Sequence, residues 1–458
     1  MKADFPLPGT VVAYRPPASG IFLGSPSLIR CADGSLLTSH DEYGPGSSED
    51  RSAQTYLYRS RDDGRTWTRL GAMRDLTVPG PDETGLFWNS FFRRDTELFS
   101  IGAAASGGGL VIRRSIDHGA TWTAAAPGRG RLIVSTDGRT HASGPLTVPF
   151  AGRIWTAVEH PLSPTFGDTR ITVLAADARA DLLDPAAWLP SNGLSRDTGW
   201  LDGTFSGWLE GCPVPTREGG LVVMLRVDNR YPNGAGIGMK AAIVRVHPSP
   251  AGSAPAISFS GGAFDPADPT GSGFVDFPGG CVRFIVRYDP RSDRYWSICS
   301  YIPEAYRNAR YNAERFRGIL VLVSSPDLAR WTVERTVVAD ERLLADDPAM
   351  REAAFDGPFG GGYYHTRHGF QYPFFLIEGD DLLVTIRTAI TDSTGGTRAG
   401  HDANYYLFRR VEDFRTREAD SGSRAKNQGP TLKPSPSSYE RERVDERIAR
   451  QTPTRSRS

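Results

Sequence analysis

A short motif that occurs twice in this chain limits its fold more than any other feature. Residues 60–67 (SRDDGRTW) and 115–122 (SIDHGATW) share the form S-x-D-x-G-x-T-W, 55 residues apart. Residues 325–331 (SPDLARW) form a third, shorter copy without the glycine. The pattern predicts a tight turn in which Asp bonds to the backbone, Gly adopts positive φ and Trp packs between sheets. Because each copy follows a strand-like segment, the chain is predicted to repeat one β-sheet unit.

Pairs of strand-like segments joined by turns predict one inner hairpin per repeat. Helical periodicity is nearly absent, and only residues 340–354 read as a short helix. We therefore expect an all-β, six-bladed β-propeller in which the strand at residues 10–14 closes the last blade. A seventh blade between Thr332 and Tyr364 is the alternative. The six hairpins are expected at residues 25–38, 88–101, 141–157, 210–226, 281–298 and 371–385.

Composition divides the chain of 458 residues into a predicted propeller, residues 1–420, and a tail, residues 421–458. The tail is rich in Ser, Pro, Arg and Glu and poor in large apolar residues, which predicts disorder. A formal net charge of zero gives no electrostatic footprint for nucleic acid. The four cysteines lack metal-ligand spacing, so we expect no metal and no cofactor. We also expect no membrane segment, a monomer and a cytoplasmic location, with secretion as the alternative if the N-terminus is processed or incomplete.

The hairpin at residues 209–226 places an acid and a base at its two open ends. Glu210 begins one strand and Arg226 ends the next, so the two form either a surface ion pair or half of an active site. In a propeller such strand ends converge on the central axis, and a funnel of acids, bases and aromatic rings suits a carbohydrate. The residues expected around this axis include His40, Asp41, Glu49, Asp50, Trp88, His141, Glu159, His160, Glu210, Arg226, Arg317, Tyr372, Arg387, His401 and Asp402.

The repeated motif and the hairpins resemble the Asp-box, or BNR, repeats and the blades of the sialidase (neuraminidase) superfamily. The resemblance implies that Glu210 activates a tyrosine nucleophile, for which Tyr372 is the candidate. It implies that Arg226 and Arg317 belong to an arginine triad that binds a carboxylate. Either Glu49 or Asp50 falls near the place of the family's acid/base aspartate. The family's first arginine lies in an F/Y-R-I-P motif, but residues 22–26 read FLGSP here, so Gly24 or Ser25 stands in its place and the triad lacks that member.

A second cluster combines His401 and Asp402 with His40 and Asp41, which belong to the last and the first predicted blades. Two His and two Asp side chains at one place could bind a metal or act as general acid and base. The alternative is that they cap loops and pack against the closing seam of the ring. Glu159 and His160 lie either in the site or at its rim.

Three functions remain open from the sequence. The first is an exo-acting, sialidase-like glycoside hydrolase that cleaves a terminal, acidic sugar from a glycan. The second is a polysaccharide lyase that cleaves next to a uronic acid, with Arg226 neutralising the carboxylate and His40, His141 or Tyr372 abstracting the C5 proton. The third is a carbohydrate-binding propeller without catalytic activity.

Overall fold

The computed structural model is an all-β propeller of six sheets. It describes residues 5–49, 52–80, 85–105, 109–132, 146–163, 168–250, 252–345, 347–353, 368–391, 397 and 400–416. The chain separates into two units, Met1–Ser421 and Gly422–Ser458. The predicted tail at residues 421–458 lies outside the described residues, and so do Asp50 and His141.

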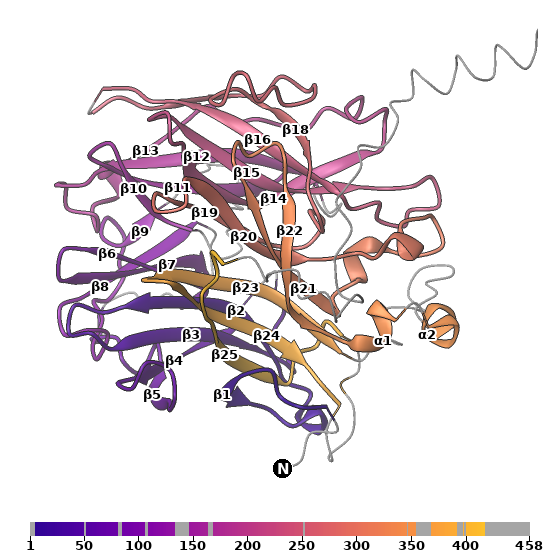
Figure 1. The fold of residues 1–458 in the computed structure, drawn as a ribbon. Coiled ribbons are helices and arrows are strands. Elements are labelled where there is room, and N and C mark those ends of the chain that lie inside the picture. The colour runs from indigo at the N-terminus through magenta and orange to yellow at the C-terminus, as the bar shows by residue number, and fades with distance from the viewer. Residues whose placement is uncertain are drawn as a thin grey trace, which may run out of the picture. The chain divides into compact units, whose positions relative to one another are not determined.

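Each blade is an antiparallel sheet, and all but the last are built from consecutive strands (Figure 1). The first blade contains β2 (Phe22–Arg30), β3 (Leu36–Tyr43), β4 (Gln54–Ser60) and β5 (Thr68–Ala72). The second contains β6 (Leu86–Arg94), β7 (Glu97–Ala104), β8 (Leu110–Ser115) and β9 (Arg131–Leu132). The third contains β10 (Val148–Phe150), β11 (Arg153–Pro161), β12 (Thr169–Asp177) and β13 (Trp188–Pro190).

The fourth blade contains β14 (Phe205–Pro215), β15 (Leu221–Asn229), β16 (Lys240–His247), β17 (Ala256–Ser258) and the additional β18 (Gly273–Asp276). The fifth contains β19 (Ile285–Asp289), β20 (Arg294–Ser300), β21 (Ile319–Ser325) and β22 (Thr332–Ala339). The two α-helices, α1 (Glu341–Leu344) and α2 (Pro348–Ala353), follow β22 where a short helix was expected. No seventh sheet occurs among the described residues. Each described helix is also too short to cross a bilayer.

The last blade joins the two ends of the propeller. It contains β23 (Gly369–Glu378), β24 (Asp381–Ala389), β25 (Tyr405–Val411) and, as its outer strand, β1 (Thr10–Tyr14). β1 pairs antiparallel with β25, so that Thr10 lies opposite Phe408. The predicted closure by the N-terminal strand is therefore confirmed, because one sheet contains strands from both ends of the propeller.

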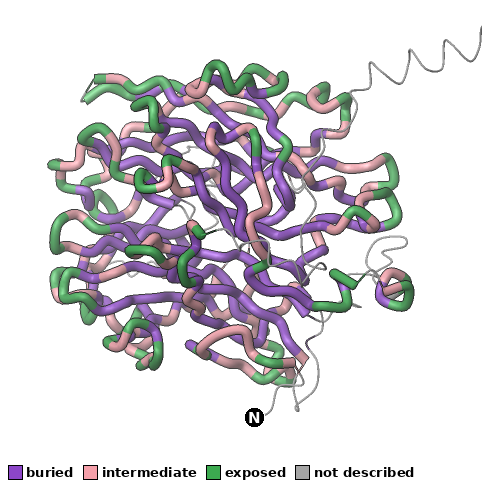
Figure 2. The backbone as a smooth tube through the Cα atoms, viewed as in Figure 1, coloured by how far each residue is buried: buried purple, intermediate pink, exposed green. Residues whose placement is uncertain are grey.

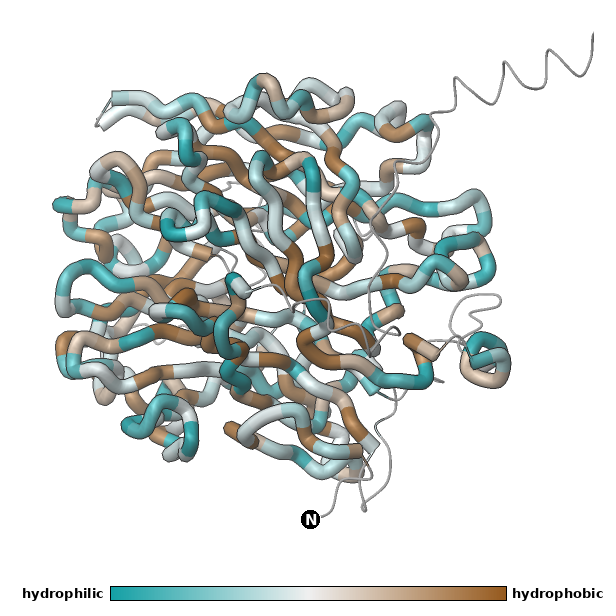
Figure 3. Tube along the Cα trace, in the orientation of Figure 1, coloured by the Kyte–Doolittle hydropathy of each residue, from teal (hydrophilic) through white to brown (hydrophobic). Residues whose placement is uncertain are grey.

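The strands are apolar because most of them are covered on both faces by neighbouring blades. Figures 2 and 3 show buried and hydrophobic residues along the strands and exposed, polar residues in the connecting turns. The turns of the repeated motif contain the predicted aspartate hydrogen bonds. Asp62 accepts hydrogen bonds from the Thr66 backbone N–H at 2.9 Å and from its hydroxyl at 2.6 Å. Asp117 and Thr121 form the same pair at the same distances.

Candidate active site

Three polar side chains from two blades meet at the centre of the ring. The hydroxyl of Tyr372, on β23, donates a hydrogen bond to Glu210 Oε1 on β14 at 2.9 Å. Arg226, on β15, donates from Nη1 to Glu210 Oε2 at 3.1 Å and lies 3.4 Å from the Tyr372 hydroxyl. Because Glu210 accepts at both oxygens, its carboxylate can take the phenolic proton of Tyr372.

A β-bulge in each inner strand aims these side chains at the axis. The strand register shifts between Leu209 and Cys212 in β14 and between Gln371 and Phe374 in β23. Glu210 and Tyr372 lie within these bulges with φ of 59° and 53°. For a residue other than glycine this left-handed conformation costs roughly 1–2 kcal/mol, and bulges commonly redirect a side chain beside an active site. Ser25 of β2 and Trp88 of β6 occupy equivalent bulges, with φ of 54° at each.

Glu159 supplies a second carboxyl group next to Glu210. It lies near the end of β11, and its Oε1 accepts a hydrogen bond from the Glu210 backbone N–H. Burial and the charge of Glu210 raise the pKa of Glu159 to about 8. Its Oε2 has no hydrogen-bond partner among the described residues. Glu159 therefore keeps its proton at neutral pH, whereas Glu210 accepts two hydrogen bonds. Acid–base catalysis uses such a pair, in which one group donates a proton and the other accepts one.

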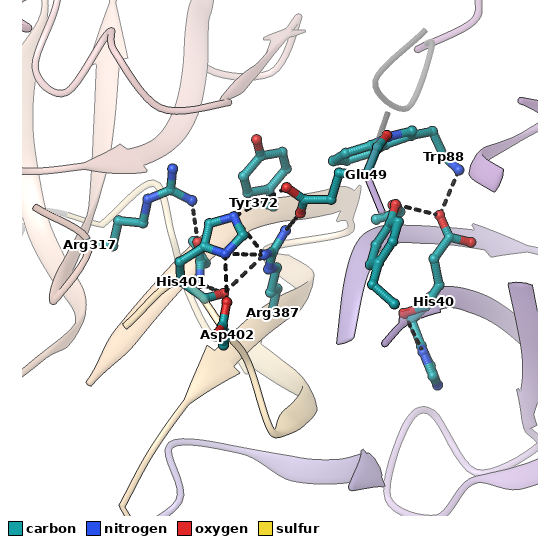
Figure 4. A network of polar contacts seen from close by, with 12 residues as sticks. His40, Glu49, Trp88, Arg317, Tyr372, Arg387, His401 and Asp402 are labelled. Atoms are coloured by element: carbon teal, nitrogen blue, oxygen red, sulfur yellow. Dashed lines mark hydrogen bonds and ion pairs between the residues drawn. The ribbon is translucent and has the colours of Figure 1, made fainter. Parts of the chain in front are cut away.

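Glu49 forms a second polar group with the last blade (Figure 4). Its Oε1 accepts from Arg387 Nη1 at 2.7 Å, and His401 Nε2 lies 3.3 Å from its Oε2. His401 also contacts Asp402, with 3.0 Å between Nδ1 and Oδ1. Burial alone would raise the pKa of Glu49, but Arg387 and His401 outweigh it and hold that pKa well below its usual range. Glu49 is therefore an anion at neutral pH.

Arginine side chains surround the ring of Tyr372. The guanidinium carbon of Arg387 lies 5.3 Å from the ring centroid, and those of Arg317 and Arg283 each lie 5.9 Å away. Arg317 donates to the neutral amide of Gln371, and its Nε donates to the Glu314 carbonyl at 3.1 Å. Burial raises the pKa of Tyr372 and the Glu210 charge adds to this effect, whereas Arg226 and Arg317 oppose it.

Gly24 and Ser25 are the two positions of β2 at which the first arginine of the family motif was expected. A Cβ at this position would lie 2.6 Å from Tyr43 Cε2 and 3.4 Å from Arg387 Nη1. The space beside Gly24 is therefore filled by an aromatic ring and by a guanidinium that comes from the opposite end of the sequence.

His40 and Asp41 do not join this polar group. The ring of His40 is fully buried and packs against Tyr58 and Tyr406 at centroid distances of 5.4 and 5.2 Å. Figure 4 shows it directed away from His401. Asp41 accepts from Thr55 Oγ1 at 2.5 Å and from the Trp88 backbone N–H at 2.6 Å. The structure thus separates the two His–Asp pairs, and its described residues contain no group of three His, Cys, Asp or Glu placed to hold a metal.

Trp88 lies between the two polar groups. Its indole N–H donates to the Glu49 carbonyl at 3.0 Å, and its ring lies 5.6 Å from that of Tyr372. The Trp88 backbone N–H also donates to Asp41, so that aspartate holds the backbone that carries the tryptophan.

Two charged residues at the site were missed from the sequence. Glu314 contacts Arg226 Nη2 at 3.9 Å and Arg230 Nη2 at 2.9 Å. It lies in the short 3₁₀ helix Ala313–Arg315, and no pattern in the sequence points to it. Arg283 follows a Gly-Gly-Cys stretch, residues 279–281, that parallels Glu210-Gly211-Cys212. This similarity between the two segments could have identified Arg283 from the sequence.

Comparison with solved structures supports the fold, whereas no protein family and no curated protein matches the sequence. An α-L-arabinanase of Penicillium chrysogenum, complexed with arabinobiose, is 12% identical with a TM-score of 0.50, over 88% of this chain and 97% of that one. The GH93 α-L-arabinofuranosidase of Fusarium graminearum is 13% identical over the same shares, with a TM-score of 0.48. A Hadza microbial sialidase is 11% identical over 85% of this chain and 66% of that one, with a TM-score of 0.47. The arabinanase comparison shows a shared propeller fold.

Proposed function

We propose that this protein is an exo-acting glycoside hydrolase that removes a terminal, acidic sugar from a glycan. The observation that carries the proposal is the Tyr372 hydroxyl held between Glu210 Oε1 and Arg226 Nη1. Tyrosine is a known alternative to a carboxylate nucleophile in glycoside hydrolysis. The arabinanase, the arabinofuranosidase and the sialidase with similar folds act on glycans, which agrees with a carbohydrate substrate.

In the proposed reaction the Tyr372 oxygen attacks the anomeric carbon while its proton passes to Glu210. The bond to the leaving oxygen breaks, and that oxygen takes the proton of Glu159. Water then attacks the anomeric carbon and gives a proton to Glu159. The bond from that carbon to the Tyr372 oxygen breaks, and this oxygen recovers its proton from Glu210. The sequence suggested Glu49 or Asp50 as the acid. Arg387 and His401 keep Glu49 ionised, which makes it a poor proton donor, whereas Asp50 lies outside the described residues and is the alternative to Glu159.

The acidic substrate is proposed from the arginines around Tyr372. Arg226 and Arg317 resemble two members of a carboxylate-binding triad, and Arg387 fills the space beside Gly24 where the third would be. We propose that Arg387 replaces that arginine. A planar guanidinium binds a carboxylate through two parallel hydrogen bonds, so three guanidinium groups around one site favour an anionic sugar. Trp88, Glu49 and His401 would contact its ring face and its hydroxyls.

A substrate screen with matched variants tests the proposal. Wild type, Glu210→Gln and Tyr372→Phe are assayed on aryl glycosides of uronic acids, sialic acid and neutral sugars, and on uronate-containing oligosaccharides. We expect the wild type alone to release an acidic sugar. An ultraviolet-absorbing unsaturated uronate would instead identify a lyase. Binding without turnover, at equal affinity in wild type and Glu210→Gln, would identify a binding protein.

A further inference from the structure

Two of the three guanidinium groups assigned to the acidic sugar already have carboxylate partners. Arg226 donates to Glu210 at 3.1 Å, and Arg387 donates to Glu49 at 2.7 Å. Arg317 differs from both, because it forms no ion pair with a carboxylate among the described residues. A cation that is bonded to one anion attracts a second anion less strongly. Of the three, Arg317 therefore has the charge that is least compensated by direct contact.

Neutral oxygen atoms hold Arg317 in place. Its Nη1 donates to the side-chain Oε1 of Gln371, and its Nε donates to the backbone carbonyl of Glu314 at 3.1 Å. The carboxylate of Glu314 itself contacts Arg226 and Arg230. Arg317 is buried, with 5% of the residue exposed. Its side chain is thus fixed beside Tyr372 by two contacts that leave its positive charge in place.

The surroundings of Gln371 allow its amide only one orientation. The residue is fully buried, and its Nε2 donates to the backbone carbonyls of Gly400 and His401 at 2.7 and 2.9 Å. Because both hydrogens of the amide are used there, its oxygen faces the guanidinium of Arg317. A carboxylate at this position would place an oxygen against the two carbonyls. The contacts of this residue therefore select a neutral amide as the partner of Arg317.

We propose that Gln371 is a specificity-determining residue that keeps the charge of Arg317 available for the carboxylate of an acidic substrate. The amide fixes the guanidinium without neutralising it, so the substrate itself supplies the compensating negative charge. A carboxylate in place of the amide would neutralise Arg317 and repel a second anion, which is how a site rejects a charged ligand. The inference rests on the acidic substrate of the proposed function and names the side chain that controls the preference for its charge.

Binding of matched sugars tests this role without any turnover. Dissociation constants for glucuronate and glucose, and for galacturonate and galactose, are measured with wild type and Gln371→Glu. Each pair differs only by a carboxylate in place of a hydroxymethyl group, so the ratio of its two constants measures the preference for charge. We expect wild type to prefer an acidic sugar, and we expect Gln371→Glu to lower that preference by about tenfold or more.

Two further variants separate charge from shape. Gln371→Met has a neutral side chain of similar length and should retain most of the preference, because Arg317 keeps its charge. Asn192→Asp is the matched control for exchanging an amide for a carboxylate. The Asn192 amide bonds to the backbone of Ile257 in the outer strand β17, so this variant should show the preference of wild type.

Three outcomes would overturn the inference: a wild type without preference for the acidic sugars, a folded Gln371→Glu protein that keeps the preference of wild type, and equal losses in Gln371→Met and Gln371→Glu. If Gln371→Glu does not fold, Glu49→Gln decides, because it gives Arg387 a neutral partner like that of Arg317. This variant should raise the preference severalfold, and an unchanged or smaller preference would contradict the inference.

The same measurements distinguish this inference from the proposed function. A protein that binds acidic sugars, loses that preference in Gln371→Glu and hydrolyses no glycan would refute the hydrolase and leave the inference standing. A protein that hydrolyses acidic glycosides, with a preference that Gln371→Glu does not change, would refute the inference and leave the hydrolase standing.

Discussion

Glu210 and Tyr372 lie 162 residues apart in the chain and are joined by a hydrogen bond of 2.9 Å. Each occupies the left-handed position of a bulge in the inner strand of its own blade. The same backbone distortion, used in two blades, therefore brings an acceptor and a phenol together.

Replacing Tyr372 by Phe should abolish hydrolysis and leave the fold intact. The phenyl ring keeps its packing against Trp88, but the attacking oxygen is lost, so kcat should fall by roughly 10³- to 10⁶-fold. The loss is measured with the best substrate from the screen. Tyr406→Phe is the control, because that tyrosine is equally buried and its hydroxyl bonds to Thr38 Oγ1 at 2.6 Å, away from the site. Similar activity losses in both variants would contradict a nucleophilic role.

The Glu210–Arg226 pair should show strong energetic coupling. Both side chains are 3% exposed, so Arg226→Met leaves a buried carboxylate with less compensation and should cost about 3–5 kcal/mol of unfolding free energy. The double variant Glu210→Gln/Arg226→Met should cost clearly less than the sum of the two single variants. Urea unfolding of the four proteins measures the coupling. Additive losses would mean that the two charges do not stabilise one another.

Glu159→Gln should discriminate between leaving groups. A proton donor matters when the departing oxygen is basic, and it matters little for a nitrophenolate. We expect kcat/KM, which reports the first step, to fall by about 10²- to 10⁴-fold on a natural glycan and much less on the nitrophenyl glycoside. Values of kcat/KM that match wild type on both substrates would remove Glu159 from the reaction and return the acid role to Asp50.

His40 should make the protein less stable in weak acid. Burial lowers the pKa of His40 from 6.5 to about 3, so between these two pH values His40 is protonated in the unfolded chain and neutral in the folded protein. The neutral, buried His40 therefore contributes fully to the unfolding free energy above pH 6.5. That contribution falls by about 1.4 kcal/mol per pH unit as the pH decreases toward 3. Burial also raises the pKa of Asp41 to about 6, which acts in the opposite direction. The difference between wild type and His40→Phe, measured by urea unfolding at several pH values, isolates His40; identical pH profiles would contradict the prediction.

The N-terminal strand should be essential for closing the ring. Val12 of β1 is 7% exposed, whereas its neighbour Val11 is 38% exposed. Val12→Asp buries an unpaired charge and should lower the melting temperature strongly, while Val11→Asp should change stability by about 0.5 kcal/mol or less. Thermal unfolding of both variants provides the comparison. Equal decreases in melting temperature for the two variants would mean that β1 does not pack against the rest of the last blade.

The sequence alone determined the repeating architecture. Turn motifs, short apolar segments and the strand at residues 10–14 predicted six blades and their closure, because strand periodicity and turn chemistry are local properties that neighbouring residues carry. The pairing of Glu210 with Arg226 followed for the same reason, since one hairpin connects them.

Only the tertiary structure decided which side chains share the axis. The sequence named Tyr372 as a candidate nucleophile without placing its side chain, and the bulge between Gln371 and Phe374 brings that side chain to Glu210. Arg387 reaches the space beside Gly24 from the last blade. His40 faces the aromatic seam rather than the site, because adjacent strand residues point to opposite faces and a shift of one residue exchanges them. Bulges and contacts between blades depend on distant residues meeting in space, and no local pattern encodes them.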